Sequence, residues 1–444
     1  MDIEIEYIGQ QTLLKLFTPV CLCYSIDDRT KDSDVVGKLE NGLARLVTSF
    51  LWVSGHIVTE DANEKNSGLM KIKPFKERPV LVVKDFRNDP NAPTMEALRL
   101  ANFPMKMLDE NTLCPLTTMP KGPNAIFPVL SLQANFIEGG LILSVVAAHN
   151  AMDFVGQGHL IRLLSKACNG EDFTKEEMEW GNSVRTEIVP LLDDAAGITK
   201  ELDRSLRTST SSFAPASNPG DCVWRTFIFN RKSLEQIKAL ANDTLPSSTE
   251  FISTDDAVSA LIWQAVTRAR LPRLDPEEET ICGRACDVRS YLNVSKCYPG
   301  VLQNMVYSIF TFKQLVSSSL GVIASDLRSK LNPSAVARNT QAIATHLANT
   351  ANKNVSFTSS IEQAKDIMLS SWAKVDLYDK IDFNLGLGMP ESVQRPDFVP
   401  VEGLLYLLPR KPNGDIYLVA CLHHHDMNNL SADHTFLKYA QSLG

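Results

Sequence analysis

His149 and Asp153 are the first pair in the chain whose residue types and spacing suggest chemistry, because they form an H-x-x-x-D pattern. A histidine titrates near neutral pH, so its imidazole can take a proton from a hydroxyl or amine as that group attacks an electrophile. The Asp153 carboxylate could accept a hydrogen bond from this ring, or from a nearby arginine, and so fix the geometry. On this pattern alone, a hydrogen-bonded histidine in the core is an equally good interpretation.

A second candidate lies late in the chain, where Asp382-Phe-Asn-Leu-Gly386 is followed by Gly388 and Pro390. Two glycines so close to an acidic and aromatic pair predict a tight loop with a close backbone approach. Such a loop is by itself more often structural than catalytic. Its occurrence together with the H-x-x-x-D pattern makes the combination specific.

The segment around His149 predicts how this residue is positioned. Residues 141–148 form an almost wholly apolar run after the glycine pair 139–140, which is typical of a buried strand that leaves a turn. Residues 129–137 predict the other strand of a hairpin, and a helical apolar pattern begins at Leu160. His149 is therefore expected at the end of a buried strand, where folds hold reactive groups on a rigid support.

The remaining patterns predict an α/β fold with mixed sheets. Apolar residues at helical spacing predict a first helix over 36–51, and capping patterns predict helix starts at Ser233 and Ser253. Strands and helices are mixed in both halves of the chain without a strict βαβ repeat. The other predicted strands span 80–83, 223–229, 280–288, 301–312, 367–373, 404–409 and 415–422, and the other helices span 176–180, 255–270, 320–331 and 334–348.

Length and composition predict two domains. At 444 residues, the chain exceeds the usual size of one hydrophobic core. Ser, Thr, Pro, Asn and Gly dominate a stretch without apolar periodicity, which indicates a crossover linker over 199–222. We therefore expect an N-terminal domain over 1–198 and a C-terminal domain over 223–444.

Charge and composition exclude several classes of protein. A net charge of −8 argues against a nucleic-acid-binding protein, whose affinity would require a basic face. No apolar run approaches the roughly 18 residues that a membrane span needs. The acidic N-terminus lacks the features of a signal peptide, and the nine scattered cysteines predict reduced, buried thiols, so we expect a cytoplasmic protein.

No metal or nucleotide site is predicted. His423, His424 and His425 are adjacent, and neighbours on a strand point to opposite faces, so the three cannot converge on one metal ion there. The sequence also has no G-x-S-x-G elbow, no Walker loop and no G-x-G-x-x-G after a strand. A serine hydrolase or a nucleotide-binding protein would therefore lack its motif.

The two candidate motifs together resemble those of the BAHD acyltransferases, which transfer acyl groups from coenzyme A thioesters to alcohols or amines. Within that superfamily, the chain resembles the fungal trichothecene 3-O-acetyltransferases. The segments that carry this narrower resemblance run over nearly the whole length: HNAMDFVGQ at 149–157, IRLLSKAC at 161–168, FISTDDAVSALIW at 251–263, YPGVLQNM at 298–305 and LSSWAKV at 369–375.

This resemblance implies two chloramphenicol-acetyltransferase-like domains with His149 in a channel at their interface. Acetyl-coenzyme A would enter as the co-substrate from one side and a small-molecule alcohol from the other, with no permanently bound cofactor. His149 would be the general base, and Asp153 would turn to an arginine in an orienting role. The family expectation for the oligomeric state is a monomer.

The resemblance also suggests roles for three further residues. Asp382 is expected to be a structural residue of its loop, paired with Arg289 or Arg284, because a buried carboxylate needs a partner. Ser253, at a predicted helix start, and Ser371, on a predicted strand, are candidate contacts for coenzyme A. A capping role for Ser253 and a plain strand position for Ser371 are the alternatives.

The chain departs from the usual family pattern at three positions. Phe154 stands where many members have glycine, and Asn384 and Leu385 replace the glycine and tryptophan of the usual D-F-G-W-G loop. Asparagine tolerates left-handed backbone angles, so the loop is expected to keep its shape. The substitutions could reshape the channel, which leaves the acceptor open.

Three functions are compatible with these observations. The first is an acetyl-coenzyme A-dependent O-acetyltransferase of a fungal secondary metabolite, with the C-3 hydroxyl of a trichothecene as the expected acceptor. The second keeps the fold and acylates another alcohol or an amine, on an alkaloid, a polyketide or a different terpenoid. The third is a non-catalytic relative that binds coenzyme A or a metabolite, and the intact His149 and Asp153 argue against it.

Overall fold

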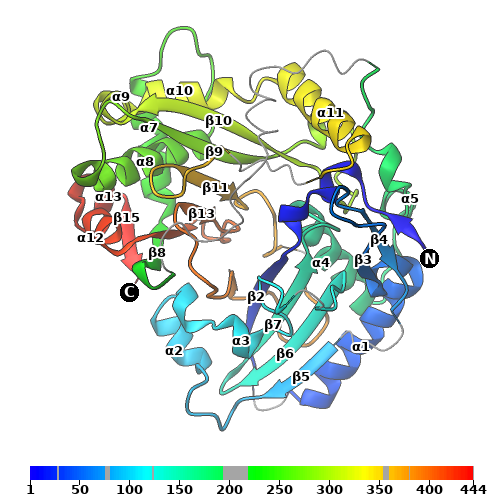
Figure 1. Cartoon of the computed structure of the whole chain (residues 1–444). Coiled ribbons are helices and arrows are strands. Elements are labelled where there is room, and N and C mark those ends of the chain that lie inside the picture. The colour runs from blue at the N-terminus through cyan, green and yellow to red at the C-terminus, as the bar shows by residue number, and fades with distance from the viewer. Residues whose placement is uncertain are drawn as a thin grey trace.

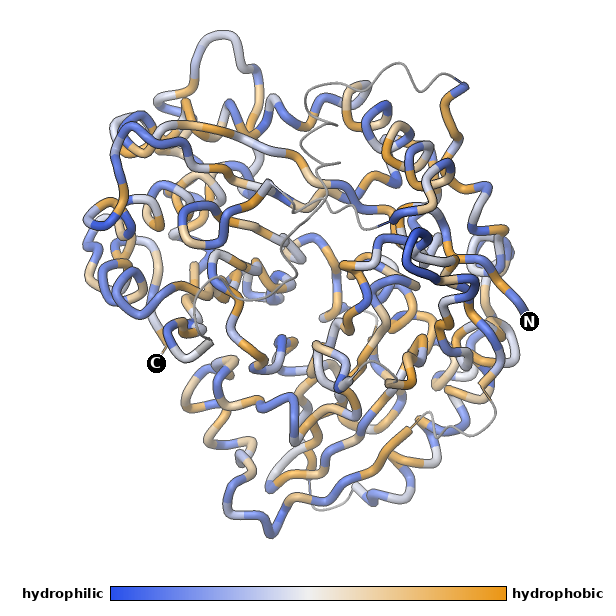
Figure 2. Tube along the Cα trace, in the orientation of Figure 1, coloured by the Kyte–Doolittle hydropathy of each residue, from blue (hydrophilic) through white to orange (hydrophobic). Residues whose placement is uncertain are grey.

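Two large mixed sheets and a small third sheet organise the chain (Figure 1). The computed structural model describes residues 1–27, 30–75, 81–122, 125–193, 219–353, 360–379 and 381–443. Helices cover the sheets (Figure 1), and hydrophobic and hydrophilic residues are interspersed along helices and strands alike (Figure 2). The predicted α/β class with mixed sheets is confirmed.

The first sheet has the order β12-β2-β7-β6-β5. Its strands are β2 (Phe17–Ser25), β5 (Leu81–Asp85), β6 (Leu130–Ile137), β7 (Gly140–Ala148) and β12 (Ser392–Gln394). Every residue of β7 is buried, and this strand pairs antiparallel with β2 on one side and β6 on the other. The apolar run that predicted a buried strand therefore forms the centre of this sheet.

Helices α1 (Asp32–Ser49) and α4 (Phe154–Cys168) pack against each other beside the first sheet (Figure 1). The buried positions of α1 include Val35, Leu39, Leu43 and Leu46, which follow the helical period seen in the sequence. The helix begins before the predicted residue 36, because acidic residues that favour a helix N-terminus occupy its first turn.

The second sheet has the order β10-β9-β11-β13-β14-β8-β15. Its strands are β8 (Cys222–Phe229), β9 (Glu279–Asp287), β10 (Gln303–Thr311), β11 (Ile367–Ser371), β13 (Leu404–Leu407), β14 (Ile416–His423) and β15 (Ala440–Leu443). Strand β11 runs parallel to both of its neighbours, whereas the outer pairs are antiparallel. Mixed pairing of this kind fits the irregular order of strands and helices in the sequence.

Helix α8 (Thr254–Arg270) is the central helix over the second sheet. It contacts α7 (Arg231–Asp243), α10 (Leu320–Ser329) and α12 (His424–Ala432), and most of its residues are buried. The predicted capping box at Ser233 is wrong, because α7 begins at Arg231 and Asn230 caps it by accepting the N–H of Ser233 at 2.8 Å. The predicted start at Ser253 is confirmed.

The remaining elements complete the two halves. The small sheet has the order β1-β4-β3 and consists of β1 (Ile3–Glu4), β3 (His56–Glu60) and β4 (Leu69–Lys73). The other α-helices are α2 (Met95–Leu100), α3 (Glu110–Leu113), α5 (Lys175–Gly181), α9 (Phe312–Ser317), α11 (Pro333–Asn349) and α13 (His434–Leu437). Across the part of the chain that the structure describes, no helix combines the length and the apolar character needed to cross a membrane.

Strand β12 connects the two halves of the chain. It lies in the C-terminal half of the sequence but pairs with β2 in the first sheet, with Val393 opposite Leu22. Most of the predicted linker, residues 199–218, lies outside the described residues, so the domain boundaries at 198 and 223 stay a prediction. The first sheet nevertheless takes strands from both sides of that linker.

Candidate active site

His149 directly follows β7, and the sheet fixes its main chain. Its N–H donates to the carbonyl oxygen of Leu16 at 2.8 Å, which extends the ladder between β7 and β2 by one step. Next to it, the Asn150 amide donates to the carbonyl oxygens of Gly9 at 2.6 Å and Gln11 at 3.1 Å. The strand end and the N-terminal segment therefore hold the His149 loop on both sides.

The His149 side chain lies in a poorly hydrated environment. Burial lowers the pKa of its imidazole below the ordinary 6.5, and this effect exceeds the opposing influence of nearby main-chain groups and of the Asp153 carboxylate. Nδ1 has no hydrogen-bond partner within the described residues. The ring is thus held in its neutral form at pH 7, as a general base requires.

Asp153 faces Arg289 in a buried ion pair. Nη1 and Nη2 of Arg289 each donate to one carboxylate oxygen of Asp153 at 3.0 Å, in the two-pronged geometry that arginine favours. The same carboxylate accepts the N–H of Gly156 at 2.8 Å, as the cap of α4, and the N–H of Leu302 at 2.7 Å. Asp153 therefore ties the start of α4 to the segment that precedes β10.

Arg289 has an acceptor for each of its five N–H groups. Besides the Asp153 bonds, it donates to the carbonyl oxygens of Tyr298 at 3.0 Å and Gly300 at 2.7 Å, and to the Asp287 carboxylate at 2.8 Å. Burial alone would lower the pKa of the guanidinium, but the two carboxylates raise it above the ordinary value. Arg289 is only 1% exposed, and the two carboxylates compensate its buried charge.

Gly156 allows α4 to approach the 298–302 segment this closely. A Cβ at this position would lie 2.0 Å from the carbonyl oxygen of Pro299, far inside van der Waals contact. Any side chain here would push the segment away and separate Asp153 from Arg289.

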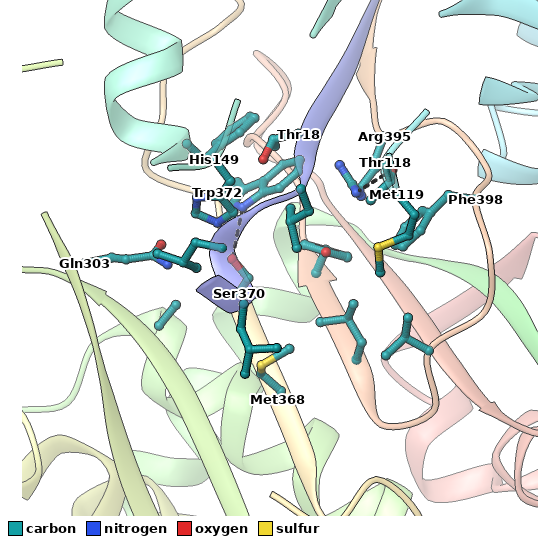
Figure 3. A pocket seen from close by; sticks show the side chains of 18 of the residues that line it. Thr18, Thr118, Met119, His149, Gln303, Met368, Ser370, Trp372, Arg395 and Phe398 are labelled. Atoms are coloured by element: carbon teal, nitrogen blue, oxygen red, sulfur yellow. Dashed lines mark hydrogen bonds between the residues drawn. The ribbon is translucent and has the colours of Figure 1, made fainter. Parts of the chain in front are cut away.

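A cavity opens in front of His149 and is lined from both large sheets (Figure 3). It contains about 970 Å³ of space without protein atoms, its mouth included. Most of its walls are apolar or aromatic, which is typical of a small-molecule site. The lining residues are Gln11, Leu13, Leu14, Leu16, Thr18, Thr118, Met119, His149, Phe154, Ala285, Gln303, Met305, Met368, Ser370, Trp372, Arg395, Phe398, Val401, Leu404 and Tyr406.

Phe154 forms part of an aromatic wall of this cavity. Its ring stacks on Trp372 with centroids 3.6 Å apart and an interplanar angle of 12°, and Trp372 in turn contacts Tyr406 at 4.9 Å. The indole N–H of Trp372 donates to Ser370 at 3.0 Å, which fixes the ring. The departure at Phe154 therefore changes the cavity itself.

The Asp382 loop lies outside this cavity. The Asp382 carboxylate accepts the N–H of Asn384 at 2.9 Å, and its carbonyl oxygen accepts from Ser165 at 3.0 Å. The predicted partners are wrong, because Arg289 binds Asp153 and Asp287 while Arg284 binds Asp256 at 3.0 Å. Within the described residues, Asp382 forms no ion pair. Its half-buried carboxylate caps a turn and does not require a charged partner.

Asn384 adopts a left-handed backbone conformation within this loop. Asn384 has φ 57°, and Gly386 and Gly388 have φ 81° and 70°, so all three lie in the left-handed region. Asparagine therefore fills a position where other non-glycine residues would be strained. Among the described residues, those of the loop from 382 to 388 do not line the cavity.

The structure brings Ser253 and Ser371 to the same end of α8. Ser253 caps this helix, accepting the N–H of Asp256 at 3.2 Å and donating to the Asp256 carboxylate at 2.7 Å. Ser371 donates to Asp255 at 2.5 Å. Each hydroxyl is therefore engaged by a carboxylate, and the cavity is lined by the neighbouring Ser370 instead.

The histidine run at 423–425 spans the end of β14 and the start of α12. His423 caps the helix by accepting the N–H of His425 at 3.3 Å, and the two rings stack with centroids 5.6 Å apart. Over the described ranges, no group of three or more His, Cys, Asp or Glu residues is placed to hold a metal ion.

The cavity contains functional candidates that the sequence did not single out. Trp372, Tyr406 and Arg395 come from segments of the second half, and Thr118 comes from the first. Trp372 lies in the LSSWAKV segment, inside the strand predicted over 367–373, whereas β11 ends at Ser371, directly before it. Nothing in the local pattern distinguishes Arg395 from a surface arginine.

Comparisons with known proteins agree with this geometry. Residues 16–168 match the trichothecene 3-O-acetyltransferase-like N-terminal domain, and residues 98–437 match the transferase family. The O-acetyltransferase dmxR13 of a Cryptosporiopsis species is 46% identical over all of this chain and 98% of that protein. Trichothecene 3-O-acetyltransferase TRI101 of Fusarium sporotrichioides is 45% identical over all of this chain and 97% of that protein.

A solved structure shares the whole fold. The crystal structure of F. graminearum TRI101 with coenzyme A and T-2 mycotoxin matches with a TM-score of 0.95 and 43% identity, covering all of both chains. The fold, the histidine site and these matches together define an acyl-coenzyme A-dependent acyltransferase. The chain belongs to the BAHD-type transferase family, as its two motifs predicted.

Proposed function

We propose that this enzyme transfers an acetyl group from acetyl-coenzyme A to a hydroxyl of a fungal secondary metabolite, with the C-3 hydroxyl of a trichothecene as the acceptor. The observation that carries the proposal is His149 in a largely apolar cavity, with a pKa lowered by burial. The donor and acceptor classes are supported by the similarity to TRI101, whose structure contains coenzyme A and T-2 mycotoxin.

In the proposed mechanism, His149 is the general base. The neutral imidazole takes the proton of the acceptor hydroxyl, and the oxygen attacks the thioester carbonyl carbon. The tetrahedral intermediate then collapses with cleavage of the carbon–sulfur bond, and the imidazolium returns the proton to the departing thiolate. The apolar walls exclude water, which would otherwise compete as the nucleophile.

Asp153 is a positioning residue in this mechanism. Its carboxylate is occupied by Arg289 and by two main-chain N–H groups, so it holds the loop that carries His149. We assign Asp382 a structural role through its turn with Asn384.

Ser253 and Ser371 are proposed contacts for coenzyme A on the β11 side of the cavity. Both hydroxyls are bound to carboxylates, so a contact would require each to exchange its present partner. Ser371→Ala should then raise the KM for acetyl-coenzyme A several-fold and leave the KM for the alcohol unchanged. Equal KM values for acetyl-coenzyme A in the variant and the wild type would contradict this assignment.

The central experiment measures free-thiol release from acetyl-coenzyme A with a panel of trichothecenes and other terpenoid alcohols, with product masses. We expect a 3-O-acetyl trichothecene, and about 10²- to 10⁴-fold slower turnover for His149→Ala, the range that general-base catalysis supplies. Wild-type turnover by His149→Ala would contradict the mechanism. Binding of coenzyme A without turnover of any acceptor would contradict the enzymatic proposal.

An alcohol other than a trichothecene is the second candidate acceptor. The dmxR13 O-acetyltransferase is as similar to this chain as TRI101 is, at 46% against 45% identity. Because this similarity does not favour a trichothecene over another alcohol, the same panel should include alkaloid, polyketide and other terpenoid alcohols. A product mass with the acetyl group on a polyketide, and none on a trichothecene, would decide for that class.

We also propose that the enzyme acts as a cytoplasmic monomer. All nine cysteines are free thiols and seven of them are buried, which suits a reducing compartment. Size-exclusion chromatography with light scattering should give a mass near the 49.2 kDa of one chain. A mass twice as large would contradict the monomer.

A further inference from the structure

Arg395 is a buried cation without a carboxylate in contact. Only 2% of the residue is exposed, and within the described ranges it forms no ion pair. A buried charge is costly unless it is paired, so an unpaired one calls for an explanation. Among the residues that the structure describes, each of the four other buried arginines has a carboxylate partner: Arg185 with Glu6, Arg270 with Asp426, Arg284 with Asp256 and Arg289 with Asp153.

The hydrogen bonds of Arg395 leave part of its donor capacity unused. One terminal nitrogen donates to the carbonyl oxygen of Pro19 at 3.2 Å, and the other donates to the hydroxyl of Thr118 at 3.1 Å. The Nε atom is buried and has no acceptor within the described residues. This contrasts with Arg289, in which every N–H group has an acceptor.

Thr118 links Arg395 to the carboxylate of Glu110. The Thr118 hydroxyl accepts from Arg395 and donates to the Glu110 carboxylate at 2.7 Å, and the Thr118 N–H donates to the same carboxylate at 2.7 Å. This relay orients the hydroxyl, so that Thr118 presents a lone pair to the guanidinium. The relay through Thr118 stabilises the guanidinium charge but does not provide acceptors for the remaining N–H groups of Arg395.

Aromatic rings surround the guanidinium. Its central carbon lies 4.3 Å from the ring centroid of Phe398, 5.1 Å from that of Tyr406 and 5.8 Å from that of Trp372. Cation–π contacts of this kind stabilise the charge and restrict the plane of the group. The in-plane N–H edge is then the part left to meet a hydrogen-bond acceptor.

Arg395 lines the catalytic cavity away from Ser370 and Met368 (Figure 3). Those two residues lie on β11, the strand of Ser371, where we place the donor. On the Arg395 side, Met119 and Phe398 also line a second groove at the surface. A ligand that enters from this groove would pass the guanidinium before it reaches His149.

We propose that Arg395 recognises the acceptor, by donating a hydrogen bond to an oxygen other than the one that is acetylated. The chemical class is a polycyclic alcohol with a second oxygen as an ether, a hydroxyl or a carbonyl. This inference rests on the proposed function. Among the described residues, Arg395 is the one charged donor on the cavity wall, and in this proposal it selects oxygenated acceptors.

The test compares each acceptor with its analogue that lacks one non-reacting oxygen. The measured quantity is the ratio of the two kcat/KM values, at saturating acetyl-coenzyme A. We expect the wild type to prefer one oxygenated acceptor about 10- to 100-fold, the usual worth of a hydrogen bond to a charged group. In Arg395→Gln this ratio should fall below about 3, because the charged donor is gone.

Two features make the test independent of folding. The ratio cancels any loss of folded enzyme, and Arg268→Gln serves as the matched control, because Arg268 pairs with Asp433 outside the cavity. The control should keep the wild-type ratio. Arg395→Lys keeps the charge without the planar N–H edge and should give an intermediate ratio.

The outcomes separate this inference from the proposed function. An unchanged ratio in Arg395→Gln would overturn the inference, as would a rise in the KM for acetyl-coenzyme A with no change in the ratio. The experiment uses whichever alcohols of the panel are acetylated. A failure to acetylate trichothecenes would therefore contradict the proposed acceptor and leave Arg395 testable with the others.

Discussion

The pKa of His149 connects its burial to the pH dependence of catalysis. Burial lowers this pKa below 6.5, so the neutral base should persist at pH values where an exposed histidine is already charged. We expect kcat/KM for the alcohol to be constant between about pH 7 and 8 and to fall on acidification with an apparent pKa below 6.5. Steady-state rates across this range check the prediction, and an acidic limb centred above pH 6.5 would contradict it.

The Asp153–Arg289 pair gives a second prediction for single residues. Asp153→Asn keeps an oxygen to cap α4 but leaves the buried guanidinium with Asp287, whose side chain is 40% exposed, as its remaining carboxylate partner, so it should cost about 3–5 kcal/mol of stability. Arg289→Gln should cost a similar amount. The double variant should lose clearly less than the sum, because it leaves no buried charge unpaired.

Urea unfolding of the four proteins completes this cycle. Additive losses would show that the two groups do not act as a pair. Activity per folded molecule should fall much less in Asp153→Asn than in His149→Ala, since Asp153 acts only by positioning.

The sequence predicted His149 and Asp153 because both lie in one short motif, H-x-x-x-D, that directly follows an apolar run. Arg395 escaped prediction for the opposite reason. Its neighbours Pro19, Thr118 and Phe398 come from three separate regions, and a single arginine carries no periodicity. For Asp382 the resemblance predicted an arginine partner, whereas the main-chain N–H of Asn384, two residues further along the turn, satisfies the carboxylate.

At the scale of elements, the Asp382 turn supports a prediction with a matched pair of variants. Asp382→Asn retains an oxygen that can accept the N–H of Asn384, so its stability should stay within about 0.5 kcal/mol of the wild type. Asp382→Ala removes the acceptor and should cost about 1 kcal/mol, with a matching fall in soluble yield. Thermal unfolding of both variants checks this. A loss in Asp382→Asn as large as in Asp382→Ala would indicate that the charge matters instead.

Elements with a long apolar run or a clear helical period were predictable, whereas the start of α7 and the short strand β12 were not. The buried strand at 141–148 and the helix at 255–270 can each be recognised from their own residues. The start of α7 depends on Asn230, which precedes the pattern that pointed to Ser233. Strand β12 has three residues, too few for an alternating pattern, so only its pairing with β2 makes it a strand.

At the scale of the whole molecule, we expect β12 to couple the unfolding of the two sheets, because it joins the first sheet from the C-terminal half of the chain. Val393 is 1% exposed, and its N–H donates to the hydroxyl of Tyr378 at 2.9 Å. The strand is therefore buried and hydrogen-bonded beside the first sheet. We expect one calorimetric transition for the whole chain. Val393→Ala should lower its stability by about 1–3 kcal/mol and shift that single transition, without splitting it. Two transitions in the wild type would contradict the coupling.

Strand β12 also limits how enzymes of this family can diversify by recombination. Residues 392–394 complete the sheet that carries His149, and the next residue is the proposed acceptor contact Arg395. A crossover that replaced everything after the predicted linker would therefore import a foreign edge strand together with a foreign acceptor wall. A recombinant enzyme should keep a stable first sheet most readily when β2 and β12 come from the same parent, because the pairing of these two strands is then unchanged. Changes in acceptor preference can then arise from the cavity residues alone.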